Sequence, residues 1–157
     1  MSSIDYIGDD SARTSANVKT KRVYYIGTTA LVRGAVLIYD TGTTLASFIK
    51  GPGFDVNISA GTVQHTFAGI LADDSVGSTG GWINILVPQP GDVVWCAVAA
   101  GTDAGDGVTI AASQAFADGG AFADEDMGVV LLDEDAADNP YGADNLAPVL
   151  FTLGYAA

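Results

Sequence analysis

The sequence has little of the residues from which metal and catalytic sites are most often built. Cysteine occurs once, at Cys96, and histidine once, at His65. These counts exclude an intramolecular disulfide, a CxxC-type metal site and a multi-histidine metal site. A Ser-His-Asp triad would need His65, and no GxSxG motif is present to position its serine. Residue counts alone do not exclude a hydrolase that uses a pair of carboxylates. We expect Cys96 to be a small core residue and the protein not to be an enzyme.

Basic residues are absent from the last two thirds of the chain. Residues 1–50 carry all six Lys and Arg and four acids, whereas residues 51–157 carry 15 acids and no base. Only two of the 19 acids are Glu, and the net charge is −13. Such a charge repels nucleic acid, whose phosphates are bound by cations, and it repels anionic lipid. We therefore expect no nucleic-acid or membrane partner, and an acidic surface that keeps the protein hydrated.

Long apolar runs and helical periodicity are also missing. The apolar runs fall far short of the roughly 18 residues that cross a bilayer, and we expect no signal peptide, because no apolar segment follows a basic start. Short apolar runs between turns of Gly, Pro, Asp and Ser are typical of strands, and the chain has 20 glycines. The sequence predicts an all-β fold, a small β-barrel or β-sandwich of about nine to eleven short antiparallel strands with little helix.

The clearest strand pattern lies in Phe67–Val98, where three short apolar runs are separated by two turn clusters. A second pattern alternates from Phe54, and it predicts that Phe54, Val56 and Ile58 face the core. The same pattern places Asp55 on the solvent side. The predicted strands are 22–26, 30–40, 45–50, 54–59, 62–72, 82–87, 92–98, 108–112, 127–132 and 147–155, with a turn at 113–120.

The N-terminal segment differs from the rest of the chain in being polar and mildly basic. We predict that residues 1–21 form an extended arm and that residues 22–157 form a single β domain with acidic C-terminal loops. A frayed terminus is the simpler alternative for such a segment, but the charge difference favours an arm that docks on a partner. Its candidate contacts are Arg13, Lys19, Lys21 and Arg22.

Acidic residues gather near the C-terminus, and hard cations such as calcium bind several oxygen ligands from a short loop. Asp133, Asp135 and Asp138 are weak calcium candidates, because the loop lacks the Gly and Glu spacing of an EF-hand. A solvated acidic loop is the favoured interpretation, so we expect no cofactor. Trp82 and Trp95 are candidates for a subunit interface or the core, with a sugar-binding platform as a further alternative.

A resemblance to a known family rests on the central stretch. The sequence AGILADD at Ala68–Asp74 is followed by a polar turn, a strand at Trp82–Val87, and PGDVVWCAV at Pro90–Val98. This arrangement resembles the head decoration (cement) proteins of tailed phages, of the phage lambda type. The resemblance covers about residues 30–115, and the acidic C-terminal third has no counterpart in it.

The resemblance implies a role on the virion. Proteins of this kind lie on HK97-type capsid shells, often as trimers, and stabilise the shell without being enzymes. The expected function is therefore a capsid decoration protein on the outer capsid surface, with the major capsid protein and further copies of itself, as a homotrimer, for partners. The alternatives are a calcium- or carbohydrate-binding β-sandwich module and, third, a small β-fold hydrolase.

Overall fold

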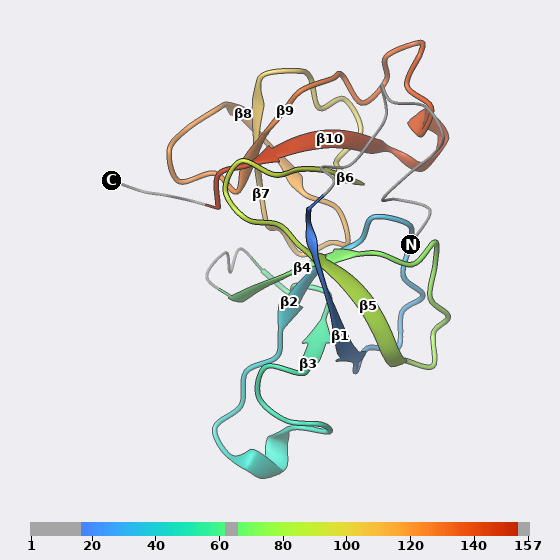
Figure 1. The fold of residues 1–157 in the computed structure, drawn as a ribbon, viewed down its shortest axis with the longest axis vertical. Helices are drawn as coiled ribbons and strands as arrows, with labels where there is room; N and C mark the ends of the chain where they lie inside the picture. Colours follow the sequence, from blue (N-terminus) through green and yellow to red (C-terminus); the bar gives the residue numbers. More distant parts are fainter. Residues whose placement is uncertain (1–16, 62–65, 154–157) are drawn as a thin grey trace.

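The computed structural model describes residues 17–61 and 66–153, and this part of the chain contains ten strands. Five strands close into a barrel in the order β1-β3-β2-β4-β5, and the other five form a sheet in the order β6-β10-β9-β7-β8. Figure 1 shows the sheet above the barrel. The helical segments η2 (Leu45–Ser47) and η4 (Gly142–Asp144) are single 3-10 turns. The all-β prediction, with a small barrel and little helix, is confirmed.

The barrel is built around β1, which pairs with two neighbours. Along its whole length it lies antiparallel to β5, and at its end it runs parallel to β3, so the barrel is not purely antiparallel. Successive side chains alternate between the two faces of a strand; Val23 and Tyr25 are therefore buried in the barrel, while Arg22 is exposed. The strands are β1 (Lys19–Tyr25), β2 (Val36–Tyr39), β3 (Asp55–Asn57), β4 (Phe67–Leu71) and β5 (Gly81–Val87).

The sheet carries the larger hydrophobic core. Trp95, Phe116 and Phe151 are among its largest buried side chains. The same core includes Val36 and Ile70 from barrel strands, so the barrel and the sheet pack against each other. The strands of the sheet are β6 (Val93–Ala97), β7 (Asp106–Thr109), β8 (Ala117–Ala121), β9 (Gly128–Val130) and β10 (Leu146–Phe151).

Two predicted segments differ from the observed strands, one because of a glycine and the other because its strand lies at the edge of the sheet. Of the predicted strand 30–40, Val36–Tyr39 forms β2, and Gly34 before it takes a positive φ of 70° that interrupts the extended backbone. The predicted turn 113–120 contains the start of β8. This strand pairs with β7 at the edge of the sheet and is largely exposed, so its sequence has no apolar alternation to reveal it.

The predictions around Asp55 are wrong for a different reason. Asp55 is 1% exposed and Phe54 is 47% exposed, the reverse of the prediction for these two residues. Val56 is buried and Ile58 packs against the barrel core, as predicted. The carboxylate of Asp55 accepts hydrogen bonds from the backbone N–H groups of Ile49 and Lys50 at 2.6 and 2.8 Å. The predicted strand at 45–50 cannot form a ladder with these donors engaged, and it contains the turn η2 instead.

Part of the predicted N-terminal arm belongs to the first barrel strand. β1 begins at Lys19, so Lys19 and Lys21 of the predicted arm pair with β5 in the barrel. Arg13 and His65 lie outside the described residues. Cys96 is a free, buried cysteine in β6, which confirms its predicted core role. In the described part of the chain, no helix has the length and apolar character needed to cross a membrane.

Candidate functional site

An exposed tryptophan on the outside of the barrel is held between an aromatic ring and a cation. The register of β1 and β5 places Tyr24 opposite Trp82 and Arg22 opposite Asn84. The rings of Tyr24 and Trp82 meet edge to face, with centroids 5.4 Å apart. From the diagonal position, the guanidinium carbon of Arg22 lies 5.4 Å from the centroid of the Trp82 ring. Trp82 nevertheless remains 45% exposed, so its indole is positioned but not covered.

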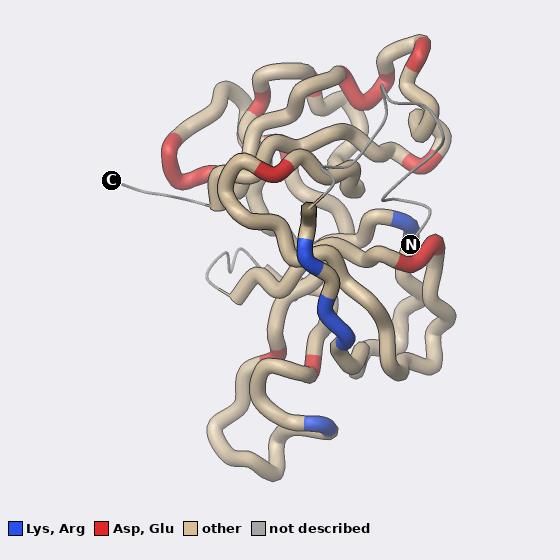
Figure 2. The backbone as a smooth tube through the Cα atoms, in the orientation of Figure 1, with Lys and Arg blue, Asp and Glu red and all other residues tan. Residues whose placement is uncertain are grey.

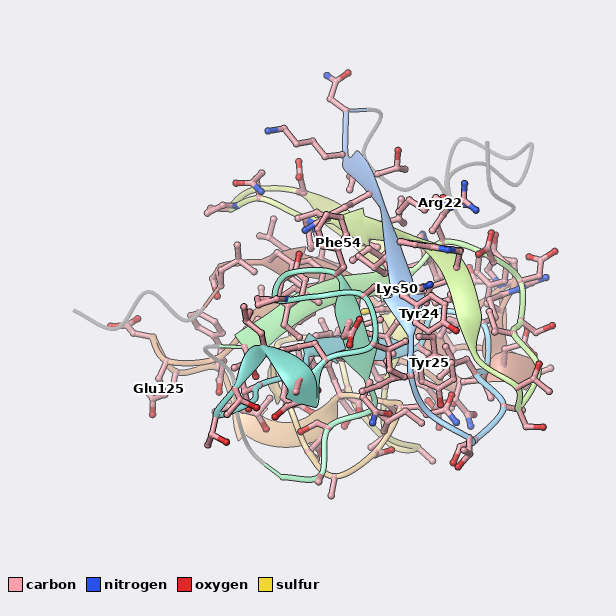
Figure 3. All side chains as sticks on the ribbon, turned by 90° about the horizontal axis from the view of Figure 1, so that it is seen from below. Arg22, Tyr24, Tyr25, Lys50, Phe54 and Glu125 are labelled. Atoms are coloured by element: carbon pink, nitrogen blue, oxygen red, sulfur yellow. The ribbon has the colours of Figure 1, made fainter. Side chains whose placement is uncertain are left out.

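Two lysines extend this arrangement toward the loop before β3. The Nζ atom of Lys50 lies 5.1 Å from the ring centroid of Tyr24 and 5.9 Å from that of Trp82. The Nζ atom of Lys21 lies 5.8 Å from the Phe54 ring. Figure 3 shows the labelled members of the group along β1 and the adjoining loop. We name the group the cationic aromatic face; its members are Lys21, Arg22, Tyr24, Lys50, Phe54 and Trp82.

The loop beside this face has a fixed shape although it projects from the barrel (Figure 1). The buried carboxylate of Asp55 binds its backbone at Ile49 and Lys50. From the other side, Lys21 Nζ donates to the Gly53 carbonyl at 2.8 Å and to the Tyr39 hydroxyl at 2.9 Å. Ile49 is still 60% exposed. The loop therefore presents apolar side chains to solvent from an ordered backbone.

Charge is unevenly distributed over the molecule. Figure 2 shows acids concentrated over the sheet and its loops, and most of the described Lys and Arg on the barrel. Within residues 17–61 and 66–153, Arg33 forms ion pairs with Asp74 at 3.2 Å and Asp144 at 3.6 Å, whereas the cations of the cationic aromatic face form none. The positive charge of that face is thus not neutralised by neighbouring described carboxylates.

The acidic loops bring together part of the predicted calcium set. Carboxylate oxygens of Asp103, Asp133 and Asp135 lie within 4.8 Å of one another; Asp138 is not part of this group. Repulsion from the carboxylate of Asp133, with smaller effects of burial and of other carboxylates, raises the pKa of Asp103. Asp133 also accepts the backbone N–H of Ala104 at 2.7 Å. The group is an exposed acidic cluster, which is common in proteins without any ion.

The two tryptophans have different environments. Trp95 is 2% exposed and meets the Tyr141 ring edge to face, with centroids 5.2 Å apart. Its core role therefore holds, and the subunit-interface and sugar-platform alternatives are wrong for this residue. Trp82 is exposed, as either alternative requires. Sequence reasoning missed Tyr24, Lys50 and Phe54. Only the fold brings Tyr24 and Lys50 beside Trp82, and Phe54 beside Lys21.

The pockets described on the surface offer little for acid–base chemistry. One of about 360 Å³ is lined mainly by apolar side chains, with Asp124 as its carboxylate. A second, of about 460 Å³ beside the loop at 40–52, has Asp40, and a third has no acidic or basic side chain. None of these three pockets contains the pair of carboxylates that a glycoside hydrolase uses.

The comparison with known proteins finds a shared fold. No protein-family model and no curated protein matches this chain. Among solved structures, the N base of the head fiber gp8.5 of bacteriophage phi29 is similar, with a TM-score of 0.53 and 9% sequence identity. The match covers 89% of this chain and 98% of that chain. At this identity the match establishes the likeness of fold, and it extends over nearly the whole of both chains.

Proposed function

We propose that this protein is a structural component of a tailed-phage virion that binds the outer surface of the assembled head shell and stabilises it. The observation that carries the proposal is the fold shared with a phage head fiber base over 98% of that base. A fold alone does not determine function. The decoration role within the virion is the expectation from the resemblance of Ala68–Val98 to head decoration proteins, and it is part of this proposal.

The distribution of charge supports a protein that lies on a surface in one orientation. A body with acids over one end, and at the other end cations that pair with no carboxylate of residues 17–61 and 66–153, is turned by the field of a charged partner before contact. Binding to the assembled shell but not to its dissociated subunits would stabilise the shell by mass action. The role requires no reaction, and we propose a structural function in place of a catalytic one.

Self-association is part of the proposal. A decoration protein that occupies three-fold positions of a capsid would be a homotrimer, with the same contact repeated around the axis. Phe122 and Leu131, which directly follow β8 and β9, are 39% and 48% exposed, and they offer apolar area beyond the protein's own core. Analytical ultracentrifugation of the purified protein measures this directly, and a strictly monomeric species at every concentration would contradict the trimer.

Co-sedimentation with capsid shells tests the function. The purified protein is mixed with shells assembled from the major capsid protein encoded nearest to its gene, and the shells are pelleted through a sucrose cushion. We expect saturable binding at a fixed ratio to capsid subunits, and no binding to unassembled subunits. Decorated shells should also stay intact to a higher temperature than bare shells. Absence of binding, together with calcium-dependent binding on a glycan array, would favour the carbohydrate-binding alternative.

A further inference from the structure

We propose that the cationic aromatic face is the surface through which the protein docks on the head shell, and that it recognises a protein surface where carboxylates lie beside apolar side chains. The inference rests on the proposed function and goes further by naming the contact. It moves the docking contact from the predicted arm at residues 1–21 to the barrel, where β1, β5 and the loop before β3 meet (Figure 3).

The composition of the face is that of a binding hot spot. Trp, Tyr and Arg dominate the energetically important positions of protein interfaces, and here Arg22 and Tyr24 each contact Trp82. Nearly half of the Trp82 surface is exposed although its ring is held in place. Leu45 and Ile49 on the adjoining loop are 79% and 60% exposed. These apolar side chains are exposed to water. A partner that covered them would remove their apolar area from water, which favours binding.

The charge of the face identifies the chemistry of its partner. Lys21, Arg22 and Lys50 form no ion pair within the described residues, in a chain whose net charge is −13. Carboxylates of a partner would complement them here and be repelled over the acidic sheet. Nucleic acid is not the favoured anion, because its binding needs many cationic contacts along the phosphate backbone. An acidic protein surface with apolar side chains complements both the cations and the exposed rings.

The face is also ordered before binding. Asp55 anchors the loop backbone at Ile49 and Lys50, and Lys21 links Gly53 to the barrel. Ordering flexible side chains and loops at an interface lowers affinity, so an interface that is already ordered avoids part of this cost. The projecting loop (Figure 1) would reach into a depression of the partner without first having to fold.

The shell is a better occupant than a second copy of this chain. The self-association proposed above uses Phe122 and Leu131, which lie outside this face, so a trimer would leave the face uncovered. Carboxylates of the shell would complement the three cations of the face. A shell-bound copy turns its acidic end away from the contact, where that charge keeps the particle surface hydrated.

Two variants and two controls test the inference in the co-sedimentation assay. Arg22→Gln with Lys50→Gln removes two charges from the face, and Trp82→Ala removes its central ring. The control for charge is Gln89→Glu with Ala137→Glu, which changes the net charge by the same amount at exposed positions outside the face. The control for the ring is Val32→Ala, which truncates an apolar side chain that is 49% exposed and lies outside the face. Unchanged circular dichroism and Tm show that each variant is folded; if Trp82→Ala fails to fold, the charge variant carries the test.

We expect each face variant to bind shells at least about tenfold more weakly than the wild type, which is the usual effect of truncating a hot-spot residue. Each control should bind within about twofold of the wild type, as variants of peripheral contacts do. Added salt should weaken wild-type binding more steeply than binding of the charge variant. If the wild type and both face variants bind equally, the inference is wrong while the proposed function stands. If the wild type does not bind, the proposed function fails. If the face variants lose self-association but keep shell binding, the occupant is a second copy, which also overturns the inference.

Discussion

Asp55 is the position where loop structure and docking can be perturbed together. Its buried carboxylate accepts the N–H groups of Ile49 and Lys50 at 2.6 and 2.8 Å, and Asp55→Ala removes both acceptors. A hydrogen bond to a charged group contributes about 1.5–3 kcal/mol. Ile49 and Lys50 are exposed, so water can hydrate the freed amides and the loss lies at the low end of that range. We expect the free energy of unfolding to fall by about 3 kcal/mol in total.

The matched control is Asp73→Ala. Asp73 accepts one backbone N–H, from Asn84 at 3.1 Å in an exposed setting, so its removal should cost about 1 kcal/mol or less. Urea denaturation gives the free energy for both variants, and amide hydrogen exchange by NMR reports on Ile49 and Lys50 individually. Asp55→Ala should also weaken shell binding, because Lys50 and Phe54 would no longer be held in place. Equal costs for the two variants, or unchanged exchange at Ile49 and Lys50, would refute the reasoning.

Three further outcomes follow from burial and charge. With Trp95→Phe the remaining Trp82 fluorescence should be strongly quenched by acrylamide, whereas with Trp82→Phe the buried Trp95 should resist it; similar quenching would be inconsistent with their exposures of 45% and 2%. Burial raises the pKa of the Cys96 thiol, so Ellman's reagent should react with it in urea but not in the native protein, and rapid native reaction would argue against the core placement. The pKa of Asp103 is raised in the folded protein, so its ionisation lowers the stability of the fold as the pH rises through that pKa. Asp103→Asn should therefore raise Tm at pH 7, and this gain should vanish at a pH below the ordinary pKa range of Asp. A gain in Tm that persists in acid would contradict the repulsion.

The sequence was sufficient to predict strands where one face or both are buried. The runs around Phe67, Trp82 and Val94 lie in β4, β5 and β6, because short apolar segments bounded by turn residues have few other ways to bury their surface. The same logic could not find β8, whose Ala and Gly residues are mostly exposed at the edge of the sheet. Nor could it foresee that β3 would run parallel to β1, since strand order depends on contacts between distant segments.

The candidate site was predictable only in part. The concentration of bases in the first 50 residues singled out Lys21 and Arg22. Trp82 was named, together with Trp95, as a candidate for a subunit interface, the core or a sugar-binding platform. That these residues share one face depends on the register of β1 against β5. Phe54 was assigned to the core because alternation is normally set by apolar burial. Here the hydrogen bonds of Asp55 to the loop bury its side chain while Phe54 is exposed and Val56 stays buried. A sequence pattern contains no sign of such a tertiary contact.

Both proposals together place the protein on a phage head with its barrel toward the shell. Cryo-electron microscopy of shells decorated with the wild-type protein measures this most directly. We expect density on the outer shell surface in which Trp82 and the loop at 40–54 contact the capsid subunits and the acidic sheet faces solvent. Density with the sheet against the shell, or shells that remain bare at saturating protein, would contradict it.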